Sequence, residues 1–379
     1  MNYNLSEREI EVRNLARDFA QNEILPVVMK YDETQEFPFE IVKKLGELGF
    51  MGIIFPEKYG GSNFSMIEYA LIIEEISKID PSIGLTIAAH NGLCTSHIYN
   101  FANEEQKMKY LPDLTSGKKL GAWGLTENVS GSDAQSLATT AEKKDGYYLL
   151  NGSKMFITHG KVGETAVVTA LTDKENRKIS AFILEKGMDG FKTGKKENKL
   201  GMRASDTSEL IFENVKVPVE NLIGEEGDGF KQALKILDSG RIAIAALSLG
   251  VAEGALEACI KYSKQRKQFG KYLSEFQATQ FKIAEISTDI EAARLLIYKA
   301  AHLKNNGEEI NLAASMAKLF ASEIAVKATN EAIQIHGGYG YIKEFPVEKL
   351  YRDVKLLTIG EGTSEVQRMI IARAVQKLF

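Results

Sequence analysis

One acidic residue of this chain is placed where a carboxylate could exchange a proton with a bound molecule. Glu361 lies between Gly360 and Gly362, in a loop that follows the apolar run of residues 356–359. Glycine has no Cβ, so the backbone on both sides of Glu361 can approach a ligand closely. A carboxylate within about 3 Å of an acidic proton can act as a general base. Taken alone, this pattern also fits an ordinary solvated turn before a helix.

Two further stretches place an aromatic residue and a threonine at the end of an expected strand. The first carries Trp123 and Thr126 ahead of a Gly-Ser turn, and the second carries Phe156 and Thr158 in the same order. Loops of this composition can offer backbone N–H groups and hydroxyls to an extended polar ligand. Each stretch by itself is also consistent with an ordinary strand end.

Several other chemistries find no support in the sequence. The chain contains neither a GxxxxGK[ST] run for a P-loop nor a GxSxG nucleophile elbow. The glycine-rich residues 224–229 leave the expected strands instead of opening a βαβ unit, so we interpret them as an interdomain loop. The histidines show no ligand spacing with partner carboxylates, and we therefore expect no metal site. They are His90, His97, His159, His302 and His336.

The composition is that of an ordinary globular protein. Hydrophobic residues make up 44% of the chain and charged residues 26%, which is typical of soluble globular proteins. The length of 379 residues predicts two or three domains. The net charge is −4 with both signs interspersed, which favours neither nucleic acid nor an anionic membrane as a partner. No signal peptide or long apolar span is apparent, so we expect a cytoplasmic protein without membrane insertion. Cys94 and Cys259 lie far apart and are expected to be buried thiols.

The elements that must position these residues change in character along the chain. The first third has helical spacing, with Ser-x-x-Glu capping boxes at residues 6–9 and 65–68. A short helix capped by Asn103 is expected to stop before Pro112. From residue 120 the pattern changes to short strands, and the helical period returns after the 224–229 loop.

Turn signals subdivide the last two thirds of the chain. Asp145-Gly146 and Asn151-Gly152 are hairpin signals between expected strands. A break is expected near Ser239-Gly240 in the long helical pattern that begins at Phe230. Helices, then strands, then helices predict an α+β multidomain fold. We expect an N-terminal α-helical domain of residues 1–119, a middle β-barrel or sandwich domain of residues 120–226, and a C-terminal four-helix bundle of residues 227–379.

Taken together, these stretches resemble the acyl-CoA dehydrogenase family, flavoenzymes that desaturate acyl-CoA thioesters. The resemblance extends from the first helix to the last residues and rests on five motifs in the family's order. These are Leu125-Thr126-Glu127 with Gly131-Ser132-Asp133, Lys154-Met155-Phe156-Ile157-Thr158, Arg266-Lys267-Gln268-Phe269-Gly270, Gln334-Ile335-His336-Gly337-Gly338-Tyr339-Gly340, and Glu361-Gly362-Thr363. The family fold, a helical domain, a β-domain and a four-helix bundle, agrees with the order derived above.

The resemblance implies roles for individual residues. Glu361 matches the catalytic base. Positions around the flavin ring and its hydrogen-bonding edge are Trp123, Leu125, Thr126, Phe156 and Thr158. Positions that contact the dinucleotide part of FAD across a subunit interface are Arg266, Gln268, Phe269, Phe276, Gln277, Gln334, Gly337 and Gly338. Thr363 and Glu365 match the loop beside the cofactor. Ser132 matches a position beside both the cofactor and the substrate. Positions that contact CoA or the thioester are Asp238, Arg241 and Gly362.

Three positions depart from the family pattern. Asn128 stands where proline is usual, His159 replaces an asparagine, and Trp123 replaces other aromatic residues. Some branches, such as the isovaleryl and long-chain enzymes, carry the base on the helix near residues 238–241. This chain has Gly240 there and Glu361 in the loop, so it resembles the short- and medium-chain branch that includes butyryl-CoA dehydrogenase.

The resemblance implies an FAD-dependent α,β-dehydrogenation of acyl-CoA to trans-2-enoyl-CoA. Glu361 would take the α-proton, the flavin would take the β-hydride, and an electron-transfer flavoprotein would receive the electrons. The expected assembly is a homotetramer built as a dimer of dimers. Two alternatives stay open at this point: an oxygen-using oxidase on the same fold, and a non-catalytic helical interaction protein that kept the fold. The acyl length, the direction of the reaction and the electron acceptor are not set by these residues.

Overall fold

The N-terminal part of the protein is helical, as expected. The structure is a computed structural model and describes residues 4–377. Both expected capping boxes are present at the starts of α1 and α4. The helices are α1 (Glu7–Phe19), α2 (Val28–Thr34), α3 (Phe39–Glu47), α4 (Met66–Ile79), α5 (Pro81–Ala89), α6 (Ser96–Phe101) and α7 (Glu104–Thr115), with π-helical turns η1 (Ala20–Ile24) and η3 (His90–Thr95) and a 3₁₀ turn η2 (Glu57–Tyr59).

Helix α7 corrects one expectation, because it continues through Pro112 to Thr115. Proline removes an N–H from the helix, but the last turn is held by hydroxyl groups instead. Thr115 Oγ1 donates to the carbonyl of Leu111 at 3.0 Å, and Ser116 Oγ donates to the carbonyl of Pro112 at 2.7 Å. These side-chain hydrogen bonds satisfy carbonyls of the last turn and stabilise the end of the helix.

The middle part forms one hydrogen-bonded sheet of mixed direction. Its order is β6-β7-β3-β2-β4-β5-β8, and β1 pairs in parallel with β4. The strands are β1 (Gly121–Gly124), β2 (Thr140–Lys144), β3 (Tyr147–Thr158), β4 (Thr165–Asp173), β5 (Lys178–Glu185), β6 (Phe191–Lys196), β7 (Thr207–Pro218) and β8 (Leu222–Ile223), the last preceded by the 3₁₀ turn η4 (Val219–Asn221).

Only one of the two expected hairpin turns is a turn. Asp145-Gly146 joins β2 to β3, with Lys144 opposite Tyr147. Asn151-Gly152, by contrast, lies inside β3, where the pairing with β7 shifts register. Gly152 has φ +139° and packs on Thr139, so this glycine supports an irregular stretch of a continuous strand.

The C-terminal part is a helical bundle dominated by one very long helix. α8 (Gly229–Gln265) is continuous over 37 residues, so the expected break near Ser239-Gly240 does not occur. The 3₁₀ turns are η5 (Leu273–Glu275), η6 (Gly337–Tyr341) and η7 (Val354–Thr358). The other elements are α9 (Gln277–Asn305), α10 (Asn311–His336), α11 (Pro346–Asp353), α12 (Ser364–Gln376) and a hairpin of β9 (Lys267–Gln268) and β10 (Lys271–Tyr272).

Helix α8 also corrects the expectation that the chain has no long apolar span. Among the described residues it alone is long and apolar enough to cross a membrane, with a mean hydropathy of 1.6 over its most apolar window. Buried residues make up 72% of that window, because α8 runs through the centre of the bundle. The apolar composition is therefore explained by packing inside the protein.

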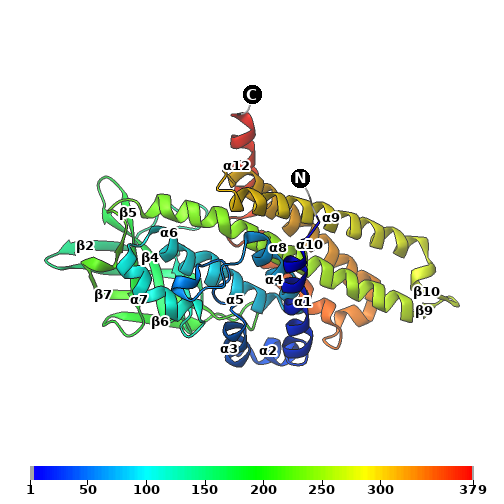
Figure 1. The fold of residues 1–379 in the computed structure, drawn as a ribbon. Helices are drawn as coiled ribbons and strands as arrows, with labels where there is room; N and C mark the ends of the chain where they lie inside the picture. Colours follow the sequence, from blue (N-terminus) through cyan, green and yellow to red (C-terminus); the bar gives the residue numbers. More distant parts are fainter. Residues whose placement is uncertain (1–3, 378–379) are drawn as a thin grey trace.

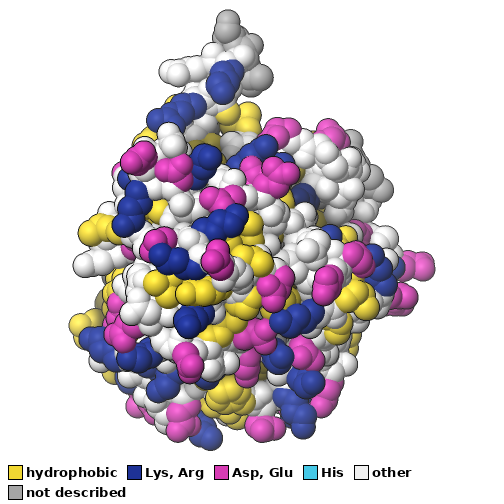
Figure 2. Space-filling view, turned by 90° about the vertical axis from the view of Figure 1, so that its left-hand side faces the viewer, with side chains coloured by type: hydrophobic (Ala, Val, Ile, Leu, Met, Phe, Trp, Pro, Cys, Tyr) yellow, Lys and Arg dark blue, Asp and Glu magenta, His cyan; other side chains and the backbone are white. Residues whose placement is uncertain are grey.

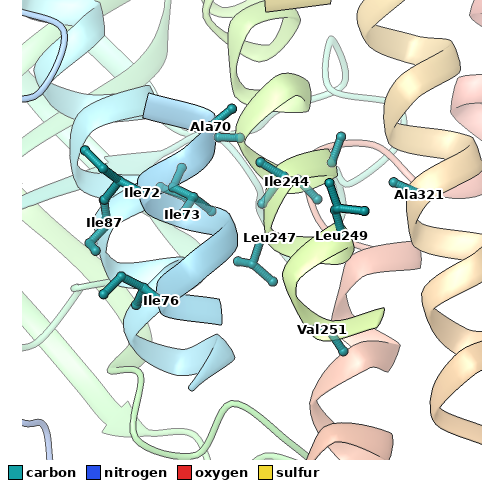
Figure 3. Packing of buried hydrophobic residues seen from close by; sticks show 14 of the residues in the cluster. Ala70, Ile72, Ile73, Ile76, Ile87, Ile244, Leu247, Leu249, Val251 and Ala321 are labelled. Carbon is teal, nitrogen blue, oxygen red and sulfur yellow. The ribbon is translucent and has the colours of Figure 1, made fainter. Parts of the chain in front are cut away.

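The N-terminal helices and the bundle share one hydrophobic core. Figure 3 shows Ala70 and Ile73 of α4 on the side that faces Ile244 and Leu247 of α8, with Ala321 of α10 on the far side of α8. All five side chains are buried. Packing of this kind between helices distant in sequence fixes the N-terminal part against the bundle. The three-part fold is confirmed, while the domain boundaries at residues 119/120 and 226/227 remain a prediction.

A buried ion cluster joins all three parts of the chain. Lys349 Nζ of α11 lies 2.8 Å from Asp80 Oδ1, at the start of α5, and 2.6 Å from Asp353 Oδ2. Asp353 also accepts a hydrogen bond from the backbone N–H of Met202, in the loop between β6 and β7. The two carboxylates raise the pKa of Lys349 despite its burial, so its ammonium group stays charged. Removing one member would leave an uncompensated buried charge.

The arrangement of the elements leaves an elongated molecule with the sheet at one end and the bundle at the other. In Figure 1, β2, β4 and β5 lie at the left and the β9–β10 hairpin at the right, with α8 running between them. α12 projects from the body at the top of this view. On the face shown in Figure 2, basic and acidic side chains are interspersed with smaller hydrophobic patches.

Candidate active site

The loop between η7 and α12 turns the carboxylate of Glu361 towards α8. Glu361 has φ +53° and Gly362 has φ +94°, so two consecutive residues adopt left-handed conformations. Thr363 then caps α12, its hydroxyl accepting from the N–H of Val366 at 3.3 Å. A Cβ added at Gly240 would lie 3.0 Å from the carboxyl carbon of Glu361 and closer still to its Oε2. Gly240 therefore provides the space that the Glu361 carboxylate occupies.

The surroundings make Glu361 a base of nearly neutral pKa. Its Oε2 atom is buried and has no hydrogen-bond partner within the described residues. Burial raises the pKa of Glu361 to about 7, and the positive charges of Lys318 and Arg241 oppose that increase. A carboxylate with a raised pKa is a stronger base, and one without a partner is available to a ligand.

Two side chains on neighbouring helices hold the backbone of this loop. Lys318 Nζ of α10 donates to the carbonyl of Gly362 at 2.8 Å. Gln367 Nε2 of α12 donates to the same carbonyl at 3.0 Å and to the carbonyl of Glu361 at 3.3 Å. Both side chains are buried. Neither was identified from the sequence; a lysine among small residues on the buried face of a helix was the available signal for Lys318.

Asp238 and Arg241 form a polar wall on α8 beside the loop. Arg241 Nη1 lies 2.6 Å from Asp238 Oδ1, and Asn311 Nδ2 donates to the same oxygen at 2.7 Å. Burial lowers the pKa of Arg241, while the charges of Asp238 and Glu361 raise it. The structure thus brings two expected substrate contacts, Asp238 and Arg241, close to the expected base. Gly362, another expected contact, directly follows Glu361 in the loop, while Ser132 is exposed in the loop after β1.

Helix α4 and the π-helical turn η3 contribute a further, unpredicted group. Tyr69 Oη donates to the carbonyl of Ala88 at 3.0 Å, and a Cβ at Gly92 would lie 3.2 Å from that hydroxyl. Burial and the charge of Glu361 raise the pKa of Tyr69, so this tyrosine stays neutral. Tyr69 is therefore the contribution of the N-terminal helices to the surroundings of Glu361.

The two stretches with an aromatic residue and a threonine are brought together at one end of the sheet. The N–H of Met155 donates to the carbonyl of Thr126 at 2.8 Å, which joins the two loops directly. Lys154 Nζ lies 2.6 Å from Glu127 Oε1 in a buried pair, and it also donates to the carbonyl of Leu125 at 3.1 Å. A buried charged pair with additional hydrogen bonds holds the shape of this loop.

The aromatic residues of these stretches differ in their environments. Trp123 is half-buried, and its Nε1 donates to His97 Nδ1 at 3.0 Å. His97 Nε2 in turn lies 3.0 Å from Oε1 of Gln232 on α8. Phe156 is 65% exposed and has φ +60°, while Thr158, at the end of β3, is half-buried.

The substitution of His159 for the family's asparagine has a structural explanation. His159 is buried, and its Nδ1 lies 3.0 Å from the carbonyl of Gly121 at the start of β1. Burial lowers the pKa of this histidine, so it is neutral. His159 therefore supports the strand that carries Trp123. The other departure, Asn128, is exposed in the loop after β1.

The remaining expected cofactor positions gather at the other end of the bundle. The guanidinium carbon of Arg266 lies 5.5 Å from the ring centre of Tyr339, which brings the end of α8 next to η6. Phe269 is 93% exposed at the tip of the β9–β10 hairpin. A helix of 37 residues spans about 55 Å, so these positions lie far from the Trp123 loop of the same chain. The exposed or half-buried residues in this group are Arg266, Gln268, Phe269, Phe276, Gln277, Gln334, Gly337 and Gly338.

Both groups of residues fit a large flat cofactor with a phosphate-containing tail. A Cβ added at Gly131, Gly337 or Gly338 would meet no atom within 4 Å, so these loops present open backbone. The exposed aromatic rings of Phe156 and Phe269 are apolar surfaces of the kind that a ligand or second chain covers. Glu365 is exposed in the first turn of α12. Within residues 4–377, no group of three or more His, Cys, Asp or Glu side chains could hold a metal ion.

Family models match almost the whole chain. The N-terminal, middle and C-terminal domains of acyl-CoA dehydrogenase match residues 6–118, 122–215 and 227–376. The chain belongs to the acyl-CoA dehydrogenase family. Among its relatives, an acyl-CoA dehydrogenase of Bacillus subtilis is 52% identical over 97% of this chain and 98% of that protein. The caffeyl-CoA reductase-Etf complex subunit CarC of Acetobacterium woodii is 45% identical over 98% of this chain and 99% of that protein.

Solved structures of similar sequence have the same fold. Butyryl-CoA dehydrogenase from Megasphaera elsdenii superposes with a TM-score of 0.97 at 46% identity, covering 99% of this chain and all of the other. A chain in the structure described as the electron transferring flavoprotein of Acidaminococcus fermentans superposes with a TM-score of 0.98 at 50% identity, covering 99% of both chains. The fold class and the resemblance inferred from the sequence are confirmed by these similarities.

Proposed function

We propose that this protein is an FAD-dependent acyl-CoA dehydrogenase in which Glu361 removes the proton α to the thioester. The observation that carries the proposal is the buried, unpartnered Oε2 of Glu361, turned towards Gly240 with a pKa of about 7. A base of this kind requires a ligand to complete its surroundings. The site residues inferred from the family pattern belong to the same proposal.

The chain's own residues account for most of what proton removal requires. Burial strengthens the base, and the backbone N–H of Glu361 is the expected donor to the thioester oxygen, where negative charge develops. Lys318 and Gln367 hold the loop, and Arg241 limits how far burial raises the pKa of the base. FAD, held by the loops around Thr126 and Thr158 and by the Arg266 end of a neighbouring subunit, supplies the hydride acceptor when bound.

Anaerobic mixing with acyl-CoA tests this function directly. The purified protein should be yellow with about one FAD per chain, and saturated straight and branched acyl-CoAs of increasing length should bleach it. Glu361→Gln keeps the shape of the side chain and removes its ability to take a proton, so bleaching should slow by about 10²–10⁴-fold or more. Acyl-CoA should still perturb the flavin spectrum of that variant. Bleaching of Glu361→Gln at the wild-type rate would show that another group is the base.

Reduction of an enoyl-CoA is the second candidate, favoured by the similarity to a subunit named as a caffeyl-CoA reductase. A carboxyl group with a pKa of about 7 can both accept and donate a proton at neutral pH. Equilibration of the flavin with acyl-CoA and enoyl-CoA pairs of different acyl structure distinguishes the two directions. A substrate pair that drives the flavin fully oxidised would identify the reductive reaction.

The proposal includes an electron-transfer flavoprotein as electron acceptor, a homotetramer and a cytoplasmic location. The electron acceptor is supported by the similarity to a subunit named for an Etf complex. The cytoplasmic location is supported by relatives from bacteria. The assembly is supported by the separation of the Trp123 loop from the Arg266 end within one chain, because a second chain could bring the two together. Rapid oxygen consumption with substrate alone would favour an oxidase instead, and light scattering would measure the assembly.

A further inference from the structure

The lysine behind the base loop is an unusual group for its position. Lys318 has no exposed surface and lies on the face of α10 formed by small residues such as Ala314 and Ala321. An ammonium group placed in such surroundings is strongly destabilising unless other interactions compensate for the lost water. Its hydrogen bond within the described residues goes to the carbonyl of Gly362, at 2.8 Å. This carbonyl belongs to the residue that directly follows Glu361.

The other charges around Glu361 are already paired. Arg241 of α8 forms a 2.6 Å ion pair with Asp238, which neutralises much of its field. Tyr69 of α4 is neutral. Lys318 forms no ion pair within 4 Å among residues 4–377, although Glu323 and Glu365 also face it from farther away. Lys318 is therefore an unpaired positive charge close to Glu361. Its charge lowers the pKa of Glu361 more than the charge of Arg241 does.

We propose that Lys318 is a positioning residue for the base: its ammonium group fixes the Gly362 carbonyl, and its charge favours the carboxylate form of Glu361. The inference rests on the proposed role of Glu361 and adds to it the group that keeps this buried base ionised. Without a nearby cation, burial alone would leave Glu361 protonated at neutral pH and unable to accept a proton. The pKa of Lys318 itself is lowered by burial to about 8, so its charge is present at neutral pH and is lost above it.

A pair of variants separates the charge of Lys318 from its hydrogen bond. Lys318→Met keeps a long unbranched side chain and removes both the charge and the donor. Gln367→Leu removes the two hydrogen bonds to the same loop carbonyls and leaves every charge in place. The pH profile of kcat/KM for an acyl-CoA substrate should show an acidic limb near pH 7 in the wild-type enzyme.

The two variants should differ in the shape of that profile. An opposite charge within a few Å shifts a pKa by about 1–3 units, so Lys318→Met should move the acidic limb upward by about one unit. At pH 7 this shift lowers kcat/KM about fivefold. At pH 9 that part of the loss should disappear, and only the pH-independent effect of the missing hydrogen bond to Gly362 should remain. Gln367→Leu should lower kcat/KM by a similar factor at every pH. Lys318→Gln, which keeps a donor without the charge, should move the limb as Lys318→Met does.

A second readout follows Glu361 without turnover. Infrared difference spectra of the protein without substrate, titrated from pH 5 to 9, should contain a protonated carboxyl band that is absent in Glu361→Gln. In Lys318→Met this band should persist to a pH about one unit higher than in the wild-type protein. An acidic limb and a carboxyl band that stay at the wild-type pH in both Lys318 variants would overturn the inference, as would an equal shift in Gln367→Leu.

The failure of the inference is distinguishable from the failure of the proposed function. Loss of bleaching in Glu361→Gln together with unshifted Lys318 variants would remove only the role of Lys318. Wild-type bleaching in Glu361→Gln would remove Glu361 as the base, and the role of Lys318 with it, whatever the infrared titration shows. Replacing a buried charge by an apolar side chain of similar size is often neutral or stabilising, so Lys318→Met should fold. Lys318→Gln should fold as well, because it removes the buried charge and keeps a donor for the Gly362 carbonyl.

Discussion

Gly240→Ala tests whether the position of the base depends on the missing side chain of α8. The added methyl group would lie 3.0 Å from the carboxyl carbon of Glu361 and closer still to Oε2. Ordinary contact begins at 3.4 Å, so the carboxylate must move by on the order of 1 Å. A displacement of about 1 Å in a reacting group can lower a rate by about 10²-fold.

The helix itself should tolerate this substitution. Alanine is favoured over glycine in a helix interior by about 1 kcal/mol, so α8 is not weakened. We therefore expect kcat/KM to fall by about 10²-fold while the FAD content and the melting temperature stay at or above their wild-type values. Stopped-flow measurement of flavin bleaching under anaerobic conditions gives the rate, and absorbance of the purified protein gives the FAD content.

Gly360→Ala is a matched control because it adds the same methyl group next to the base. At Gly360 a Cβ would lie 3.6 Å from the carbonyl oxygen of Leu356, which is ordinary contact. Its effect on the rate should be within a few-fold of wild type. If Gly240→Ala bleaches as fast as Gly360→Ala, then the carboxylate of Glu361 does not depend on this space and the packing argument is wrong.

Burial raises the folded-state pKa of Glu361 to about 7 from its ordinary value of 4.5, so the stability of the wild-type protein should fall as pH rises between those values. The free energy of unfolding of Glu361→Gln should therefore rise by up to about 3 kcal/mol relative to wild type between pH 4.5 and 8, as measured by urea unfolding. A pH-independent difference between the two proteins would contradict the raised pKa. Glu361→Gly with Gly240→Glu should regain part of the bleaching rate that Glu361→Gly loses, with a changed preference for acyl shape, because both side chains reach the same space; no recovery at any acyl-CoA would show that the two positions do not serve the same α-carbon. Arg266→Ala should lose FAD and weaken assembly, as measured by absorbance and light scattering, because guanidinium groups bind pyrophosphate through paired hydrogen bonds; a fully active monomer would be incompatible with this role.

Local sequence patterns predicted the elements and the base loop but not the groups that meet there. The glycines around Glu361 mark a loop that can approach a ligand, and the structure places its carboxylate in a buried site. Lys318 and Tyr69, which also face this site, are 43 and 292 residues away in sequence, and no local pattern connects them to Glu361. Their convergence depends on the packing of α4, α8 and α10 in one core.

The incorrect expectations share a physical cause. Gly240 predicted a helix break because glycine has low helix propensity, yet tertiary packing keeps α8 continuous and uses the glycine to accommodate Glu361. Asn151-Gly152 predicted a turn from its preference for left-handed backbone, and the sheet uses that freedom for an irregularity within β3. In each case the residue's special property was identified correctly, and its use was decided by neighbours that are distant in sequence.

The packing of Gly240 against Glu361 also restricts how this family can diverge. A carboxylate on α8 and a carboxylate in the loop would occupy overlapping space, so a chain cannot carry both without displacing one of them. Under the proposed role of Glu361, losing this residue first leaves no base, and gaining a side chain at Gly240 first disturbs the existing one. Either order passes through an impaired intermediate, which makes the two substitutions epistatic. Lineages that carry the base on the helix and lineages that carry it in the loop should therefore remain separated, each with its own fixed residue at the opposite position.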